Sequence, residues 1–345
     1  MNDRIRTLIV DDSAFARKVL RGVLGGDDGI EIVGTARDGL DALEKIGDLA
    51  PDVVTLDLVM PNLDGVGVLR ALQSKSKAPP VVIVSMADDD SDLGVAALAA
   101  GAFDVVKKPT ALATDRLYEL ADELRAKVRA AARARPMRAA LDVRPLAVPV
   151  PLVAKRTSAI VIGTSTGGPQ ALSVLLRSLP AEIPVPIAIV LHMPTGYTEA
   201  FANRLDGDCA LEVMEARDGL AMKPGRAIIA RAGLHLVLRP PDESGCVACA
   251  LESSPSDSLH RPSVDVLFES ATRAYGAGVL GVVLTGMGND GTRGSLAIAA
   301  AGGRVLTEAA ASCIVYGMPR AVVEAGASSD AAPLEQLASL ILRDL

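Results

Sequence analysis

The sequence predicts an α/β protein with two doubly wound domains, each built on a parallel β-sheet that helices flank. Short apolar runs alternate with amphipathic segments along most of the chain. Several of these runs end in a polar residue, at the strand end where open α/β sheets place their sites. At about 150 residues per domain, the 345 residues correspond to two domains.

The first half of the chain contains four apolar runs that are typical of buried strands. They lie at residues 6–10, 53–57, 81–84 and 105–107. Segments with the helical 3.6-residue period separate them. These segments are residues 13–24, 41–49 and 66–73. The alternation predicts a parallel sheet of the flavodoxin-like order.

Polar side chains gather at the ends of these runs. Asp11 and Asp12 follow the first run, and Asp57 ends the second. Because the carboxyl ends of parallel strands share one edge of a sheet, the three carboxylates predict a hard-oxygen site suited to Mg²⁺. Ser85 and Lys108 follow the third and fourth runs. A hydroxyl and an ammonium at the same edge would bind a phosphoryl group on an aspartate.

The second half opens on a strand-to-helix turn that carries a serine. The apolar run 159–162 leads into Gly163, and Ser165 stands just before Gly167 and Gly168, where a helix is expected. At such a turn the hydroxyl is exposed, and the N–H groups of the helix N-terminus point to where an oxyanion would form. A phosphate cradle is the alternative, although neither common glycine-rich phosphate pattern matches.

A serine nucleophile needs a base, and the chain has three histidines. His192 is the best candidate, because it follows the apolar run 186–191 and therefore lies at a strand end. His235 lies in the alternating segment 234–239, which predicts a histidine on a sheet face in one arm of a β-hairpin. His260 precedes a helix, where it would border the site without doing chemistry.

Asp290 is the candidate third member of a triad. The apolar run 279–285 leads directly into the turn 286–291, and a carboxylate there would orient the imidazole and stabilise its cation. The alternative is ordinary turn and N-cap chemistry, which is common for Asn-Asp-Gly. The second half is therefore predicted to be a Rossmann-like parallel sheet with a β-hairpin, carrying a Ser-His-Asp triad.

Five separated segments of the second half form one ordered set. They are GTSTGGP at 163–169, LHMP at 191–194, HRPSVDVLF at 260–268, LTGMGNDG at 284–291 and ASCIVYGMPR at 311–320. This set resembles the catalytic domain of the chemotaxis protein-glutamate methylesterases. The resemblance implies Ser165, His192 and Asp290 as the triad, with no cofactor for the esterase reaction. It also implies hydrolysis of glutamate γ-methyl esters, and deamidation of particular glutamines, on methyl-accepting chemoreceptors through an acyl-enzyme on serine.

The first half carries a second set. Its members are VDDS at 10–13, DLVMPNLDG at 57–65 and KP at 108–109. This set resembles the receiver domain of two-component response regulators, which implies a chemotaxis histidine kinase as phosphodonor. The implied roles are phosphoacceptor for Asp57, Mg²⁺ ligands for Asp11, Asp12 and Asp57, switch hydroxyl for Ser85 and phosphoryl contact for Lys108. One position departs from the pattern, because Val105 stands where receivers often place an aromatic switch residue.

Four further residues are expected near the serine. The N–H of Thr166 directly follows the nucleophile and is expected to donate to the oxyanion, with the backbone of Met287 as a second donor. Arg261 and Ser263 are expected to line a substrate groove. Ser263 also fits the N-cap of a helix at 264–274, and both interpretations stay open.

A change in composition marks the join between the halves. We expect a receiver domain at 1–125, a helix tail with a Pro/Ala/Arg-rich linker at 126–156 and a catalytic domain at 157–345. The net charge of −7 and the lack of a helix-turn-helix pattern argue against nucleic-acid binding. The chain has no run of about 18 apolar residues and no N-terminal signal region. We therefore expect a cytoplasmic protein without a membrane span.

Two functions of different class remain. The first is a phosphorylation-gated esterase and amidase that acts on methylated receptors. The second is a receiver-linked signalling adaptor, or an esterase-like domain that serves a pathway other than chemotaxis. The presence of serine, histidine and aspartate together favours the first, because an adaptor has no need of all three.

Overall fold

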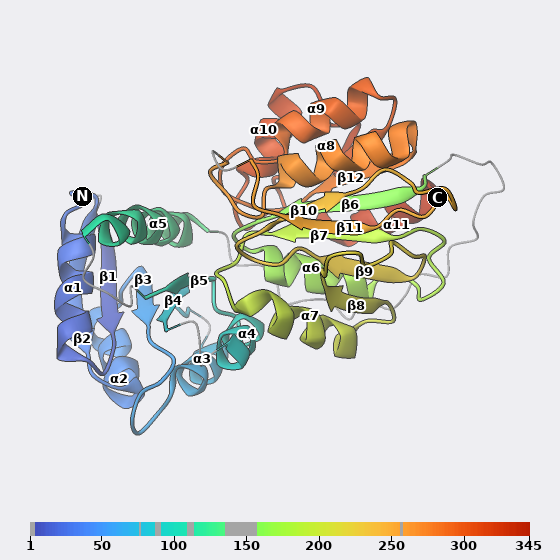
Figure 1. The fold of residues 1–345 in the computed structure, drawn as a ribbon. Helices are drawn as coiled ribbons and strands as arrows, with labels where there is room; N and C mark the ends of the chain where they lie inside the picture. The colour runs from blue at the N-terminus through green and yellow to red at the C-terminus, as the bar shows by residue number, and fades with distance from the viewer. Residues whose placement is uncertain (1–3, 76, 87–90, 109–113, 135–156, 256–257) are drawn as a thin grey trace. The chain divides into compact units, whose positions relative to one another are not determined.

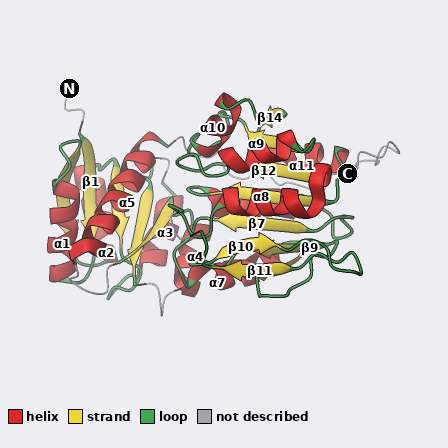
Figure 2. Ribbon diagram, turned by 45° about the horizontal axis from the view of Figure 1, so that its top comes forward, coloured by secondary structure: helices red, strands yellow, loops and turns green. Residues whose placement is uncertain are grey.

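The computed structural model describes the whole chain except residues 1–3, 76, 87–90, 109–113, 135–156 and 256–257. The chain forms two compact units, Met1–Arg135 and Pro136–Leu345, which are described separately (Figure 1). Each unit consists of strands and flanking helices (Figure 2). The α/β class expected from the sequence is confirmed. The described residues do not include residues 135–156 of the expected helix tail and linker at 126–156, or Pro109 of the second motif set.

The first unit is a five-stranded parallel sheet with the strand order β2-β1-β3-β4-β5. Its strands are β1 (Ile5–Val10), β2 (Ile30–Ala36), β3 (Val53–Leu56), β4 (Val81–Ser85) and β5 (Asp104–Lys107). Its helices are α1 (Ala14–Gly25), α2 (Gly39–Leu49), α3 (Gly65–Gln73), α4 (Ser91–Ala99) and α5 (Thr114–Arg133). This is the strand order that the alternation of segments predicts. It brings the ends of β1, β3, β4 and β5 to one edge of the sheet.

Helix α5 extends further than the expected end of the first domain. Residue 125 lies inside this helix, which continues to Arg133. Lys127, in the second half of the helix, is buried, and its Nζ contacts Asp104 Oδ1 at 3.1 Å and Val105 O at 2.7 Å. These contacts attach the later part of α5 to β5, so the helix tail packs as part of the first unit.

The second unit is a seven-stranded parallel sheet with the order β14-β13-β12-β6-β7-β9-β8, accompanied by the antiparallel pair β10–β11. The sheet strands are β6 (Ala159–Thr164), β7 (Ile187–Leu191), β8 (Glu212–Glu215), β9 (Arg226–Ile229), β12 (Val279–Val283), β13 (Arg304–Glu308) and β14 (Asp330–Ala332). The pair is β10 (His235–Leu238) and β11 (Cys249–Glu252). The helices are α6 (Gly168–Arg177), α7 (Tyr197–Asp208), α8 (Val264–Tyr275), α9 (Thr292–Ala300), α10 (Met318–Glu324) and α11 (Leu334–Arg343).

Strand register places the candidate serine and histidine side by side. Thr164 ends β6 and pairs with Leu191, which ends β7, and the N–H of His192 donates to Thr164 O at 3.1 Å. Ser165 and His192 are each the next residue, so both leave neighbouring strands at the same edge. Strand β12 flanks β6 on its other side, and the turn after β12 therefore reaches that edge as well.

Two glycines shape the turn around Ser165. A Cβ on Gly163 would lie 2.3 Å from Cγ1 of Val264, so glycine lets α8 approach β6 closely. Gly167 is the N-cap of α6 and has a φ of 79°, in the left-handed region that favours glycine. A Cβ there would also lie 2.9 Å from Ile314. The backbone at this turn is therefore held tightly on both sides of the serine.

A buried apolar cluster joins the central strands to the β10–β11 pair and to α8. Its members include Val161, Val190, Leu236, Leu238 and Phe268. This packing holds the β10–β11 pair, and with it His235, against the N-terminal part of α8. Within the part of the chain that the structure describes, no helix is long and apolar enough to cross a membrane.

Candidate functional sites

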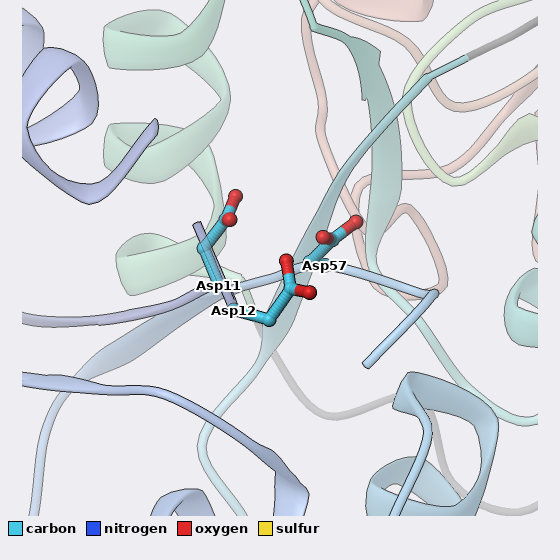
Figure 3. Close-up of side chains that lie close together, drawn as sticks. All are labelled: Asp11, Asp12 and Asp57. Carbon is cyan, nitrogen blue, oxygen red and sulfur yellow. The ribbon is translucent and has the colours of Figure 1, made fainter. Parts of the chain in front are cut away.

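The three predicted carboxylates of the first unit lie together. Asp11 and Asp12 follow β1, Asp57 follows β3, and one oxygen from each lies within 4.8 Å of the other two. Figure 3 shows the three side chains at these strand ends. Asp11 and Asp57 are buried, whereas Asp12 is exposed. Three oxygen donors open to solvent on one side suit Mg²⁺, which keeps several waters and takes few protein ligands.

Lys108 reaches the same carboxylates. Its Nζ lies 2.7 Å from Asp11 Oδ2 and 2.7 Å from Asp57 Oδ2. The N–H of Lys108 donates to Ser85 O at 2.8 Å, so the ends of β4 and β5 are linked beside the acidic cluster. Ser85 is buried, and so is Val105 at the position where an aromatic residue is often found in receivers. All five predicted polar residues of this unit therefore lie at one edge of the sheet.

Burial and charge act against each other in this cluster. Burial raises the pKa of Asp57, and the repulsion from Asp11 adds to this rise while Lys108 opposes it. Burial alone would lower the pKa of Lys108, but its bonds to Asp11 and Asp57 outweigh that effect and raise it. Lys108 is therefore held as a cation between the two buried carboxylates.

In the second unit, Ser165 lies between the end of β7 and the turn after β12. Its N–H donates to Thr285 O at 3.1 Å. A Cβ on Gly286 would lie 2.9 Å from Cβ of Ser165, so the turn passes directly over the serine. The Ser165 side chain keeps partial solvent exposure. This combination leaves the hydroxyl accessible on a backbone that two neighbouring segments hold.

His192 and Asp290 form a close pair. His192 Nε2 lies 2.9 Å from Asp290 Oδ2, and both side chains are largely buried. Burial alone would raise the pKa of Asp290, but the bonds from His192 and from the N–H groups of Asp265 and Val264 hold this pKa well below its usual range. Asp290 is therefore a carboxylate that can only accept, and the proton between the two residues belongs to Nε2.

Asp290 is not an ordinary helix cap of its own turn. Gly291 is the N-cap of α9, and it caps that helix without a side-chain bond. Besides the Gly291 N–H of its own turn at 3.0 Å, the Asp290 carboxylate accepts bonds at the start of α8, from the Val264 N–H at 2.8 Å, the Asp265 N–H at 3.0 Å and the Ser263 hydroxyl at 2.9 Å. The N-terminus of a helix favours a negative charge, so α8 stabilises the ionised form of Asp290.

The second ring nitrogen of His192 faces no hydrogen-bond partner among the described residues. His192 Nδ1 is buried and unbonded, and no hydrogen bond joins it to the Ser165 hydroxyl in the described structure. His260 stacks on the His192 ring, with the ring centroids 4.2 Å apart. The predicted border position of His260 is thus a direct contact, and the stack limits how the His192 ring can turn.

The other predicted residues lie near this pair in different environments. Thr166 is buried, and its carbonyl accepts the Thr285 hydroxyl at 3.1 Å. Met287 is partly exposed on the turn that passes over the serine, and Arg261 is exposed. Ser263 is only 2% exposed, and its hydroxyl contacts Asp290 and caps α8. The structure therefore places Ser263 behind the carboxylate and not on an open groove.

The contact between His235 and Ser263 is not predicted by the sequence. The alternating pattern predicted only a histidine on a sheet face, and His235 is indeed buried at the start of β10. Its Nδ1 also accepts the N–H of Ser263 at 3.2 Å. The two residues lie 28 positions apart and meet only because the β10–β11 pair packs on α8, so no local pattern signals this bond.

Comparison with known proteins assigns both units to families. The CheB methylesterase family matches residues 160–341, and the response regulator receiver domain family matches residues 7–121. A Myxococcus xanthus protein named protein-glutamate methylesterase/protein-glutamine glutaminase 5 is 59% identical over 343 residues, which cover 98% of this chain and 97% of that protein. The chain belongs to the CheB methylesterase family.

Further CheB relatives match over nearly their whole length. A protein-glutamate methylesterase/protein-glutamine glutaminase from Symbiobacterium thermophilum is 42% identical and covers 99% of both chains. The crystal structure of the Thermotoga maritima CheB methylesterase catalytic domain is 38% identical, with a TM-score of 0.53, and covers 55% of this chain and 98% of that domain. Both resemblances drawn from the sequence motifs are confirmed, and this CheB-family chain joins a receiver to a methylesterase domain.

Proposed function

We propose that this CheB-family chain hydrolyses glutamate γ-methyl esters, and deamidates particular glutamines, on methyl-accepting chemoreceptors. In this proposal Ser165 is the nucleophile, His192 is the base and Asp290 orients the base. The observation that carries this proposal is the 2.9 Å bond between His192 and Asp290 beside Ser165, at the ends of adjacent strands. Family membership supports the reaction class, and the geometry around Ser165 supports the roles proposed for the three residues.

The proton position on His192 defines its part in the reaction. Because Nε2–H donates to the Asp290 carboxylate, the neutral ring keeps its lone pair on Nδ1. That nitrogen is buried and unbonded among the described residues, so it is the acceptor for the Ser165 hydroxyl proton once the hydroxyl turns toward it. Asp290 then stabilises the imidazolium that forms.

These groups account for every proton transfer in the acylation step. Ser165 Oγ attacks the ester carbonyl carbon while its proton passes to His192 Nδ1. The N–H groups of Thr166 and Met287 are the proposed donors to the oxyanion of the tetrahedral intermediate. The intermediate then loses its methoxy group, which takes the proton from His192 and leaves as methanol.

Deacylation uses the same nitrogen. Water gives a proton to His192 Nδ1 and attacks the acyl-serine ester. The proton then passes to the Ser165 oxygen as the acyl–serine C–O bond breaks, and the glutamic acid that forms loses its remaining proton to solvent. With a glutamine substrate the C–N bond breaks in the first step, and the leaving group departs as ammonia. One acyl-enzyme thus accounts for both activities.

The first unit is proposed to switch this activity on. Asp57 accepts a phosphoryl group from a chemotaxis histidine kinase, and Lys108 contacts the transferred group. Asp11, Asp12 and Asp57 would hold Mg²⁺, because their oxygens lie within 4.8 Å of one another and include an exposed carboxylate. When bound there, Mg²⁺ supplies positive charge that offsets the charge of the phosphoryl oxygens. Ser85 is the proposed switch hydroxyl.

The domain limits remain proposals. We place the receiver at 1–125, the helix tail and linker at 126–156 and the catalytic domain at 157–345, and the family matches to residues 7–121 and 160–341 fall within the two domains. The continuation of α5 to Arg133 supports counting the helix tail with the receiver when fragments are made.

The decisive experiment is methanol release from receptor membranes carrying methyl-esterified glutamates, with and without acetyl phosphate and Mg²⁺. We expect methanol release by the full-length protein and a higher rate with the phosphodonor. An adaptor with an inactive hydrolase fold would release no methanol under either condition. Methanol release at the same rate with and without acetyl phosphate would support the catalytic assignment and contradict the proposed switch.

A further inference from the structure

His235 is buried, and both of its ring nitrogens are bonded. Nε2 lies 3.1 Å from Pro255 O, and Nδ1 accepts the Ser263 N–H at 3.2 Å. A carbonyl oxygen can only accept, so Nε2 carries the proton and Nδ1 keeps a lone pair for Ser263. Both bonds are satisfied by the neutral ring alone, because the cation would present an N–H to the N–H of Ser263.

The contact with Ser263 continues into the catalytic residues. The Ser263 hydroxyl donates to Asp290 Oδ1 at 2.9 Å, and Asp290 Oδ2 receives His192 Nε2–H at 2.9 Å. His235 therefore fixes the backbone of a residue whose side chain fixes the catalytic carboxylate. Every member of this chain of contacts is buried or nearly so, and water cannot easily replace a lost bond.

Packing alone does not require a histidine at this position. Leu236 and Leu238 lie on the opposite face of β10, in the buried apolar cluster, and His235 is fully buried on its own face, where an aliphatic residue could also be buried. Such a residue would leave the Ser263 N–H buried without an acceptor, which is costly. The hydrogen bond to the Ser263 N–H, and not apolar packing, therefore explains a histidine at position 235.

We propose that His235 is a positioning residue for ester hydrolysis, acting through Ser263 on the Asp290 carboxylate that orients His192. This inference rests on the proposed function. It gives a second histidine a role in the reaction, although His235 does not contact the substrate.

The charged groups around His235 come from three segments. Glu252 of β11 lies opposite His235 in the β10–β11 pair. Arg261 precedes the start of α8, and Asp290 contacts the far side of Ser263. Burial lowers the pKa of His235, and the Arg261 charge adds to this, while the bond to Pro255 O and the charges of Asp290 and Glu252 act in the opposite direction. The net result keeps the ring neutral, as the two hydrogen bonds require.

Two amide substitutions separate the two ring nitrogens. In His235→Asn the amide oxygen can occupy the Nδ1 position and accept the Ser263 N–H, whereas in His235→Gln the amide nitrogen can reach Pro255 but no acceptor lies at the Nδ1 position. Both variants are made in the full-length protein and assayed for kcat and KM in methanol release. Ser165→Ala is the inactive control, and acetyl phosphate labelling of Asp57 reports an intact receiver.

We expect His235→Gln to lower kcat by about 10- to 100-fold, because small displacements of catalytic groups have effects of this size. KM should stay within about twofold, and His235→Asn should recover most of the rate. Equal kcat values for the two variants, or a higher kcat for His235→Gln, would overturn the inference. Failure of the proposed function is distinguishable, because the wild-type protein would then release no methanol or Ser165→Ala would still release it.

Discussion

His192 and Asp290 are joined through Nε2 of the imidazole, at 2.9 Å, and not through Nδ1. Because Asp290 is ionised and accepts three further bonds from the start of α8, its position is set before substrate arrives. The orientation leaves Nδ1 as the only ring nitrogen that can take a proton from Ser165. The proposed triad therefore depends on a carboxylate whose position is determined by its bonds to the N-terminus of α8.

Asp290→Asn tests this dependence. An amide keeps the shape but can place a donor against Nε2–H, which favours the wrong tautomer of His192, and we expect kcat to fall by about 10⁴-fold. Kinetics of methanol release measure the loss. Asp242→Asn, on an exposed turn of the same unit, is the matched control and should keep the wild-type rate. A loss below about tenfold in Asp290→Asn would remove Asp290 from the triad.

Ser165→Ala and His192→Ala test the other two members. Each should lower the rate by about 10⁴- to 10⁶-fold, and the double substitution should cost little more than either alone, because the members of a triad act as a unit. Circular dichroism should show an unchanged fold. Near-wild-type methanol release by Ser165→Ala would place the nucleophile elsewhere.

Asp57→Ala tests the receiver assignment. Acetyl phosphate with Mg²⁺ should label the wild-type protein and leave the variant unlabelled, since the acceptor carboxylate is missing. Removal of Mg²⁺ by a chelator should also abolish labelling, because the acidic cluster needs a counter-charge for the phosphoryl group. The control is Asp64→Ala, because Asp64 caps α3 through the Gly67 N–H and lies outside the cluster. It should still be labelled, and persistent labelling of Asp57→Ala would contradict the assignment.

Parts of both sites could be predicted from sequence because strand ends are local signals. Asp57, Ser165 and His192 each follow an apolar run, and in parallel sheets such residues meet at one edge. The bonds of Asp290 to the start of α8 could not be predicted in this way. Neither could the contact between His235 and Ser263, because both depend on how α8 packs against the sheet and the β10–β11 pair. Sequence alternation gives the face of a strand and says nothing about its partner across the fold.

The stability of the second unit should depend on pH through His235. Its folded pKa is lowered from the ordinary value of 6.5, so the unfolded chain binds the proton first as pH falls. The free energy of unfolding should therefore be highest above pH 6.5 and should decrease below it, with a slope of at most about 1.4 kcal/mol per pH unit for one group. Denaturant unfolding between pH 7.5 and 5.5 measures the slope. The asparagine in His235→Asn does not titrate in this range, so the free energy of unfolding of this variant should change less with pH. Identical slopes for the wild type and the variant would show that His235 is not the group responsible.

The last prediction concerns why a receiver and an esterase share one chain. A receiver has no chemistry to offer an ester, so its useful contribution is a surface that changes between two states when Asp57 is phosphorylated. We propose that the unphosphorylated receiver blocks access to Ser165 and that phosphorylation releases it.

Because both domains share one chain, the effective concentration of the receiver near the esterase is high. A modest interface would then be sufficient for inhibition, and a few kcal/mol from the phosphoryl group would shift the equilibrium strongly. A fragment that begins at Thr157 should therefore release methanol faster than the unphosphorylated full-length protein and should not respond to acetyl phosphate. Full-length Asp57→Ala is the matched control, because it should stay at the low rate with or without the phosphodonor. A fragment no more active than the unphosphorylated whole would contradict steric inhibition, and the receiver would then have to activate the esterase by direct contact.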